Sequence, residues 1–275
     1  MPKKAPKNPP TSDKDPEDLA APAAKVAIDI DAIESQLPPK QNRSNHVVVK
    51  VEGLHKSFDL GKQRVHVLKG IDLNFYSGEF VIIYGPSGCG KSTFLHTVLG
   101  LEPPDRGQVV LRNEDLYEMD HDTRTNFRRQ KIGMVFQQSN WIKSMSVLGN
   151  VAYPLWLDGW QEDEAKKKAM EQLGQVEMTD YADYHPNELS GGQQQRISLA
   201  RAMVTDPWII MTDEPTGNLD STSGTDVMTM LTKLNRQDRR MIIMVTHDVG
   251  FLPLATRRIG MKDGQVIADE HDYTR

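Results

Sequence analysis

The sequence predicts an α/β fold in which a parallel core sheet is joined by an antiparallel β subdomain and an α-helical subdomain. Three observations support this class. A short apolar strand at 80–84 runs into a glycine-rich loop and then into a helix. Segments from 46 to 76 alternate between polar and apolar residues, as short strands do. A block from about 138 to 190 has helical spacing and little strand pattern, which predicts a helical insertion in the core.

Composition sets further bounds on the chain. Its 275 residues suffice for one large α/β domain or two small ones. A net charge of −5 argues against nucleic acid as the main partner. The single cysteine excludes an intramolecular disulfide and fits a reducing compartment. No apolar run approaches the ~18 residues of a membrane span, so any action at a membrane would require another chain.

The first 45 residues differ in composition from the rest. They are rich in Pro, Ala, Lys and Asp and nearly lack aromatic residues, so they cannot bury enough apolar surface to offset chain entropy. We therefore predict a disordered tail over 1–45, in which only 26–33 could order locally. Two roles stay open for this tail, a solvated leader or a segment that docks on a partner.

The remaining elements follow from periodicity. The antiparallel part is expected to contain strands at 46–52, 65–68, 71–76 and 108–111, while 132–136 is a core strand. The insertion is expected to contain helices at 146–157, 162–173 and 179–184, with Ser146 and Asp163 as N-caps. Beyond it we expect a helix at 193–203, a strand at 208–211, a helix at 221–234, a strand at 241–245 and a hairpin turn at Asp263-Gly264.

The glycine-rich loop fits the phosphate-binding pattern GxxxxGK followed by Ser or Thr. Its residues are Gly85, Pro86, Ser87, Gly88, Cys89, Gly90, Lys91, Ser92 and Thr93. Glycines let a phosphate chain lie against backbone amides, and the helix that follows adds free N–H groups. Lys91 can reach the β- and γ-phosphates, and the Ser92 hydroxyl can ligate Mg²⁺. With a strand before it and a helix after it, the pattern favours a nucleotide site over an ordinary glycine turn.

Two acidic residues follow the apolar run at 208–212. Asp213 stands where a carboxylate would complete the Mg²⁺ shell through Ser92 and water, and Glu214 is then placed to polarise an attacking water. Taken alone, Asp213 could equally be a cap at the end of a strand. The phosphate loop elsewhere in the chain favours the metal role.

A second glycine pair opens a second helix. The residues are Ser190, Gly191, Gly192 and Gln193, preceded by a leucine. A serine hydroxyl and free amides at a helix N-terminus suit a γ-phosphate, although Ser-Gly-Gly is also an ordinary N-cap and turn. Only one of the two anion sites carries a lysine. Two identical chains arranged head to tail would let each anion site face the nucleotide of the other chain.

In their order along the chain, the phosphate loop, the Leu-Ser-Gly-Gly-Gln signature, Asp213-Glu214 and His247 resemble the nucleotide-binding subunit of an ATP-binding cassette (ABC) transporter. The resemblance covers about residues 46–270. It implies a P-loop NTPase (RecA-like) core with an antiparallel β subdomain and an α-helical subdomain. It also implies an ABC ATPase domain over 46–275, with the helical insertion at about 138–190.

The resemblance assigns roles to four further residues. Phe58 would stack on adenine, and Gln137 would contact Mg²⁺ and water while sensing a transmembrane partner. Asp220 would cross the dimer, and His247 would hold the γ-phosphate. Simpler interpretations remain: Phe58 as core, Gln137 as a surface amide and His247 as a hydrogen-bonded histidine at a strand end.

Within the family, the segments at 67–70, 193–196 and 214–220 resemble the branch of macrolide exporters, lipoprotein-releasing complexes and the cell-division ATPase. This implies ATP and Mg²⁺ as cofactors, a head-to-tail homodimer around two ATP·Mg²⁺, and a transmembrane permease on a separate chain. It places the protein at the cytoplasmic face of the inner membrane. Gly149, where the branch usually has Glu, and the unusual stretch 140–145 leave the partner open. A regulatory ATPase that acts through a membrane partner on cell-wall or division machinery is the alternative.

Overall fold

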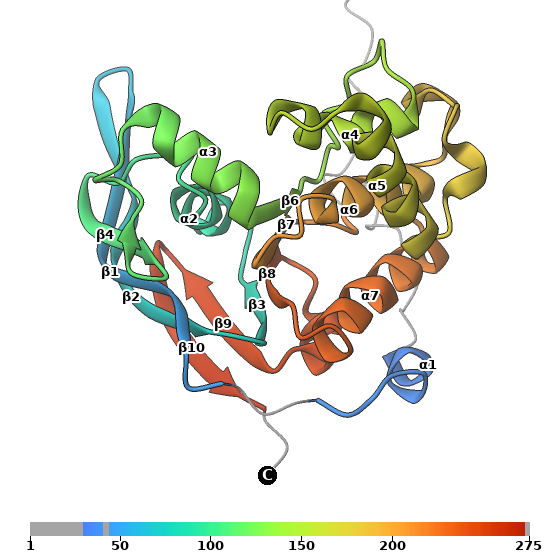
Figure 1. The fold of residues 1–275 in the computed structure, drawn as a ribbon. Coiled ribbons are helices and arrows are strands. Elements are labelled where there is room, and N and C mark those ends of the chain that lie inside the picture. The colour runs from blue at the N-terminus through green and yellow to red at the C-terminus, as the bar shows by residue number, and fades with distance from the viewer. Residues whose placement is uncertain (1–29, 41–43, 273–275) are drawn as a thin grey trace, which may run out of the picture.

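Two β-sheets and a group of helices make up the described part of the chain, residues 30–40 and 44–272, in the computed structural model (Figure 1). The larger sheet has six strands in the order β10-β9-β3-β8-β7-β6. Four neighbours, β3, β8, β7 and β6, run parallel, and β9 is parallel to β3 while β10 pairs antiparallel with β9. Their bounds are β3 Phe80–Tyr84, β6 Ile132–Val135, β7 Ile209–Asp213, β8 Met241–Thr246, β9 Arg257–Lys262 and β10 Gln265–His271.

The central strands are buried on both faces, which explains why they are continuous apolar runs in the sequence rather than alternating ones. In a parallel sheet of this kind, ligands bind beyond the carboxyl ends of the strands. A ligand of this sheet is therefore expected at the loops that follow β3, β7 and β8.

The second sheet is antiparallel, as predicted, with the order β2-β1-β4-β5. Its bounds are β1 Val47–Leu60, β2 Gln63–Tyr76, β4 Arg106–Leu111 and β5 Glu114–Asp115. The two strands expected at 65–68 and 71–76 are one strand, which continues through Gly70 in the left-handed region (φ 73°). The pairing shifts register four times along β1, and these irregularities bend the long hairpin without ending it.

Six long helices accompany the sheets: α2 Lys91–Val98, α3 His121–Lys131, α4 Val147–Leu157, α5 Glu162–Gln175, α6 Gly191–Met203 and α7 Ser221–Arg236. The described chain also has 3-10 helices η2 Thr179–Tyr181, η3 Pro186–Glu188 and η4 Val249–Leu254. The Ser146 cap is confirmed, because its Oγ accepts from the Gly149 amide. The Asp163 cap is wrong: Gln161 precedes the helix, and Asp163 lies in its first turn. The helix expected at 179–184 is only the short η2.

Sequence periodicity did not reveal α3. The helix buries none of its residues, so it lacks the apolar stripe on which such a prediction depends. A local signal was present: the Asp120 carboxylate caps the helix by accepting from the amides of Asp122 and Thr123.

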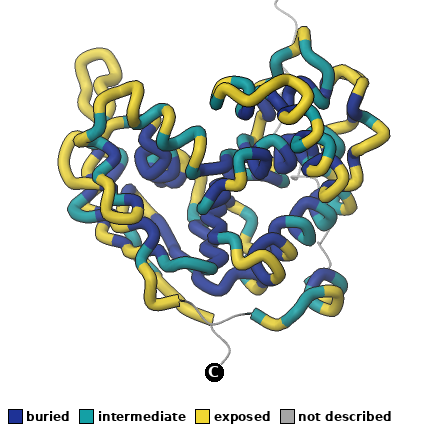
Figure 2. Tube along the Cα trace, viewed as in Figure 1, coloured by how far each residue is buried: buried dark blue, intermediate teal, exposed yellow. Residues whose placement is uncertain are grey.

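Apolar side chains gather on both sides of the core sheet, as the dark segments of Figure 2 show. One cluster joins the sheet to α4–α7, and the other joins it to α2 and the antiparallel sheet. The phosphate loop follows β3 and Asp213 ends β7, so both lie at the carboxyl edge of the parallel strands. No helix in the described ranges is long and apolar enough to cross a bilayer.

The prediction of disorder over 1–45 is wrong for residues 30–40. Here α1 Ile30–Ser35 packs onto the domain, and the side chain of Ile33 is 0% exposed. The apolar residues of 26–33 were the predicted exception, and from Ile30 onward they order because the domain offers an apolar surface and a buried arginine. Residues 1–29 and 41–43 lie outside the described part.

Candidate nucleotide-binding site

The glycine-rich loop connects β3 to α2 in a conformation that needs its glycines. A Cβ at Gly85 would overlap the carbonyl oxygen of Met261 on β9, and a Cβ at Gly90 would lie 3.0 Å from the carbonyl oxygen of Val67. Gly90 precedes α2 with φ 104°, in the left-handed region. Packing against neighbouring strands thus requires these glycines, in addition to the phosphate approach that the sequence predicts.

Lys91 lies inside the loop that it terminates. Its ammonium donates to the carbonyl oxygens of Gly85, at 2.8 Å, and Pro86, at 3.1 Å, and the residue is only 6% exposed. The loop therefore curls around a positive charge. Phosphate oxygens that enter the loop can replace these carbonyls as acceptors, because an ammonium bonds more strongly to a charged oxygen than to a neutral carbonyl.

Ser92 and Asp213 meet across the sheet edge. The Ser92 Oγ donates to Asp213 Oδ1 at 3.1 Å, and His96 Nε2 lies 3.8 Å from Oδ2. Burial raises the pKa of the Asp213 carboxyl. A cation beside it would favour the ionised form. A hydroxyl and one carboxylate are oxygen ligands of the kind Mg²⁺ takes together with substrate phosphates. The described residues contain no cluster of three His, Cys, Asp or Glu side chains that could hold a metal ion.

Glu214 is held by three contacts from the end of β8. Its amide donates to the Val245 carbonyl at 3.0 Å, and its carboxylate accepts from Thr246 Oγ1 at 3.1 Å. The other carboxylate oxygen lies 2.8 Å from His247 Nδ1. Glu214 itself has φ 47°, in the left-handed region that few non-glycine residues adopt. Thr246 was missed by sequence reasoning, because a threonine that ends a buried strand gives no signal of its own.

One cavity of about 460 Å³ brings most of the predicted residues together. It is lined by Phe58, Val67, Ser87, Gly88, Gly90, Lys91, Ser92, Thr93, Gln137, Asp213, Glu214 and His247. Phe58 is 36% exposed at this cavity, so it is not a core residue, and Lys56 Nζ lies 5.0 Å from its ring centroid. Gln137 is exposed and lies against Gly217. Gly85, Pro86 and the buried Cys89 lie outside the lining.

The second glycine motif lies outside this cavity. Ser190 caps α6: its Oγ accepts from the Gln193 amide at 3.3 Å, and the Gln193 side chain accepts from the Ser190 amide at 2.9 Å. Asp220 caps α7 by accepting from the amide and the hydroxyl of Ser223. A Cβ at Gly192 would lie 2.6 Å from Ser223 Oγ, so the two helix starts lie against each other. Within one chain, Ser190, Gly191, Gly192, Gln193 and Asp220 serve local structure.

Comparisons with known proteins give one consistent result. The sequence profile of the ABC transporter family matches residues 68–217. An uncharacterized ABC transporter ATP-binding protein of Methanocaldococcus jannaschii is 41% identical over 227 residues, which cover 81% of this chain and 97% of the relative. A lipoprotein-releasing system ATP-binding protein of Chlorobium chlorochromatii is 38% identical over 226 residues, 82% of this chain and 92% of the relative.

A macrolide export ATP-binding/permease protein of Chlorobaculum tepidum is 40% identical over 222 residues; these cover 81% of this chain but only 34% of the relative. Solved structures of the M. jannaschii cassette are also similar, with a TM-score of 0.77 at 40% identity. The similarity covers 82% of this chain and 100% of that one. One of these structures is a dimer and another is a dimeric post-hydrolysis state bound to ADP and phosphate.

Proposed function

The chain belongs to the ABC transporter family as one of its ATP-hydrolysing cassettes, and from this premise we propose that it powers a membrane complex of the export or mechanotransmission type. The similar macrolide export and lipoprotein-releasing proteins support this class of work. The complex would place the chain at the cytoplasmic face of the inner membrane, against permease subunits on separate chains.

One observation carries the mechanism. Lys91, Ser92, Asp213, Glu214 and His247 face a single cavity, whereas Ser190 and Asp220 lie outside it. A site with a phosphate loop but no signature serine is complete only when a second copy supplies that serine. Two chains arranged head to tail around two ATP molecules would complete both sites at once, because each chain supplies its Ser190 to the other. The dimeric cassettes among the structural relatives support this arrangement.

Each residue then has a defined task. Lys91 and the loop amides bind the β- and γ-phosphates, while Ser92, Asp213 and Gln137 would hold Mg²⁺, which neutralises charge on the phosphates when bound. Phe58 packs against the base. Glu214 accepts a hydrogen bond from the attacking water and orients it, and His247 holds the γ-phosphate through the ring edge that does not contact Glu214. Positioning and charge stabilisation supply most of the acceleration in phosphoryl transfer.

A subunit-complementation experiment tests the head-to-tail arrangement. Both chains carry Glu214→Gln to slow turnover; one also carries Lys91→Ala and the other Ser190→Arg. Each chain alone has no complete site, so neither should retain ATP. Mixed dimers contain one complete site, so the mixture should occlude up to one ATP per dimer, measured by filter binding and gel filtration. A mixture that retains no more ATP than the single variants would contradict the arrangement.

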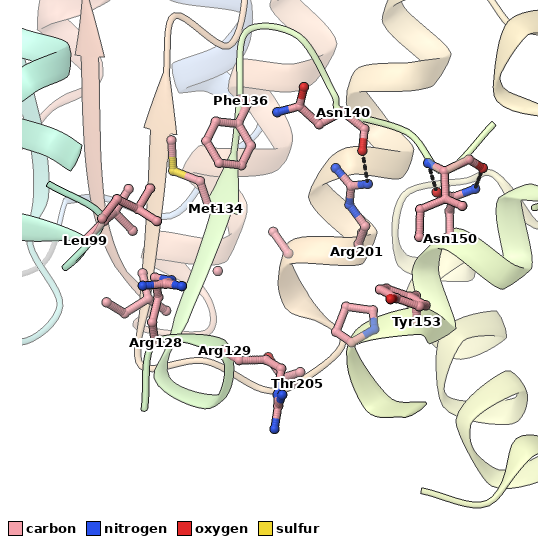
Figure 3. Close-up of a pocket in the computed structure, with 16 residues that line it drawn as sticks. Leu99, Arg128, Arg129, Met134, Phe136, Asn140, Asn150, Tyr153, Arg201 and Thr205 are labelled. Carbon is pink, nitrogen blue, oxygen red and sulfur yellow. Dashed lines mark hydrogen bonds between the residues drawn. The ribbon is translucent and has the colours of Figure 1, made fainter. Parts of the chain in front are cut away.

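A groove offers a docking surface for the membrane partner. It has a volume of about 390 Å³ and lies between α3 and β6 on one side and α4 and α6 on the other (Figure 3). Leu99, Met134, Phe136 and Tyr153 give it an apolar lining. The loop that follows Gln137 forms one rim, so an occupant of the groove would lie close to a residue of the nucleotide site.

Charge indicates the chemistry of the occupant. The charged residues in the lining are three arginines, and Arg129 is paired with Asp158 at 2.7 Å. Within the described residues, Arg128 and Arg201 have no carboxylate partner: Arg128 donates to the Gly100 carbonyl at 3.3 Å, and burial lowers its pKa. A half-buried guanidinium is stabilised most by a carboxylate. We therefore expect the partner segment to combine apolar side chains with an Asp or Glu.

Arg201 also connects the groove to the nucleotide site. It donates to the carbonyl oxygens of Ser139 and Asn140, the latter at 3.3 Å, and lies 4.5 Å from the ring of Trp141. Burial lowers its pKa to about 10. A partner carboxylate would compete with these carbonyls for the guanidinium. The loop that begins at Gln137 would then shift with the occupancy of the groove.

Photo-crosslinking identifies the occupant. A photoreactive amino acid replaces Tyr153 in the groove or, as a control, the exposed Tyr184 outside it. In membranes, position 153 should crosslink to an integral membrane protein through a peptide that contains Asp or Glu, and position 184 should not. A crosslinked peptide without a carboxylate contradicts the charge argument, and crosslinks to soluble proteins alone contradict the docking surface.

The same experiment tests the alternative, a regulatory ATPase of cell-wall or division machinery. A crosslinked partner with many spans and a lined cavity supports substrate passage. A partner with few spans and a large extracytoplasmic domain supports mechanotransmission. Copurification of a cell-wall hydrolase with that partner would favour the regulatory role.

A further inference from the structure

Residues 30–40 form a segment that we call the N-terminal strap. It contains α1, which contacts both α7 and η4 and lies near α7 in Figure 1. Ile33 is fully buried in the same apolar cluster as Phe251 and Leu254 of η4. The strap therefore forms part of the core.

An ion pair between the buried Arg236 and the partly exposed Glu34, whose side chain is 35% exposed, holds the middle of the strap. Both terminal nitrogens of Arg236 on α7 donate to the Glu34 carboxylate, at 2.7 and 2.6 Å, and one also donates to the Pro38 carbonyl at 3.0 Å. The Arg236 side chain is only 1% exposed, and its hydrogen bonds lower the pKa of Glu34. A buried guanidinium that lost this carboxylate would be strongly destabilised. The pair therefore favours the docked strap.

The far end of the strap reaches η4 by a second route. Lys40 Nζ lies 2.7 Å from the Asp272 carboxylate, which also accepts from Arg258 at 2.9 Å. Arg258 donates through its Nε to the carbonyl oxygen of Leu252 in η4, at 2.9 Å. The strap thus contacts η4 through Ile33 and holds it indirectly through Arg258.

The start of η4 is continuous with the catalytic residues. Asp248 caps η4 by accepting from the Gly250 amide at 3.0 Å, and its own amide donates to Thr246 Oγ1 at 3.0 Å. The same Thr246 hydroxyl donates to Glu214, and His247 contacts the other oxygen of that carboxylate. A displacement of η4 would therefore move the atoms that orient Glu214 and His247.

We propose that Ile33 and Glu34 of the N-terminal strap are positioning residues for ATP hydrolysis, which act through η4 on the Glu214–His247 pair. This inference rests on the catalytic roles proposed above for that pair. The strap packs against α7 and η4, and none of its residues lines the nucleotide cavity. Its release should therefore reduce the rate of the chemical step and leave nucleotide binding almost unchanged.

A charge swap in the full-length chain tests the proposal. Glu34→Arg sets two guanidinium groups against each other and should release the strap, whereas Glu34→Arg with Arg236→Glu restores the pair in reversed polarity. Misplacement of catalytic groups by about 1 Å can cost up to about a hundredfold in rate. We expect kcat to fall about tenfold in the single variant, with KM for ATP within about twofold, and to recover at least in part in the double variant.

The controls separate positioning from folding. Glu162→Arg, alone and with Lys166→Glu, makes the same swap in an exposed pair on α5 and should leave kcat unchanged. Glu34→Gln is a milder variant in case Glu34→Arg does not fold, and it should lower kcat in the same direction. Hydrogen exchange reports strap release at residues 33–37 and loosening at residues 247–254.

Two results would overturn the proposal. One is faster exchange at residues 33–37 with kcat within twofold of the wild type. The other is a lower melting temperature in Glu34→Gln without a change in kcat, which would make the strap a stabilising element only. Glu214→Gln in the same preparations distinguishes the two proposals: wild-type turnover in that variant would refute the catalytic roles themselves.

Discussion

Replacement of Glu214 by glutamine changes the proposed catalytic group with little change in shape. One carboxylate oxygen becomes an amide nitrogen, and the negative charge is lost. The remaining oxygen can still accept from Thr246 Oγ1, which lies 3.1 Å from the carboxylate in the wild type. The amide group can rotate to form a hydrogen bond with His247 Nδ1, which lies 2.8 Å from Glu214 Oε1 in the wild type. The local hydrogen bonds therefore survive in this variant.

The expected effects on stability and on rate differ greatly. With its hydrogen bonds kept, the variant should lose less than about 1 kcal/mol of unfolding free energy. Loss of the group that orients and polarises water typically costs about 10² to 10⁴ in rate, which is about 2.7–5.4 kcal/mol of activation free energy. ATP affinity should stay within about threefold, because Lys91 and the loop amides are unchanged.

The assay is steady-state phosphate release, with nucleotide affinity measured in parallel by fluorescence titration. Thr246→Val is a matched variant that keeps the carboxylate but removes the hydroxyl that holds it, and it should lose an intermediate factor of about ten in kcat. Glu162→Gln on exposed α5 controls for the loss of a surface charge. If kcat of Glu214→Gln lies within about threefold of the wild type, Glu214 does not orient the attacking water.

Three further predictions concern the loop and the metal site. Lys91→Ala should abolish ATP binding in a titration, because the loop would lose the buried ammonium that now bonds to Gly85 and Pro86; retained affinity would refute the site. Gly85→Ala should lower the unfolding free energy by about 2–4 kcal/mol in denaturant titrations, since its Cβ would overlap the Met261 carbonyl, whereas Gly159→Ala, with open space around it, should cost less. Burial raises the pKa of Asp213. In the nucleotide-free protein this carboxyl therefore contributes most stability below its unfolded pKa and loses that contribution as pH rises through the folded pKa. Asp213→Asn should raise the melting temperature at neutral pH and flatten its pH dependence; an unchanged dependence of melting temperature on pH would contradict the raised pKa of Asp213.

Most of the site could be predicted because its residues are tied to local sequence. The phosphate loop needs a strand, glycines and a helix in a fixed order, so Lys91 and Ser92 were identified from one stretch. Asp213 and Glu214 were predicted because two acidic residues end an apolar run in a chain that also carries a phosphate loop. Thr246 was missed, since its role depends on a contact with Glu214 from a different strand.

The sequence by itself determined the class of fold and the nucleotide chemistry. The phosphate loop is encoded by neighbouring residues, because its backbone conformation and its phosphate contacts depend on them. The buried strands appear in the sequence as apolar runs. It did not reveal α3, which is a helix that buries none of its residues and so carries no periodic signal. It also predicted disorder where the strap is ordered.

Only the tertiary structure showed that the strap is ordered and which of the predicted phosphate ligands share one cavity. Glu34 and Arg236 are 202 positions apart in the sequence and become partners only when α7 and the domain surface exist to receive Ile33. Likewise, the sequence predicts both Ser190 and Lys91 as phosphate ligands, but of these two residues only Lys91 lines the cavity. Local chemistry is encoded in neighbouring residues, whereas contacts across the chain depend on how its elements pack.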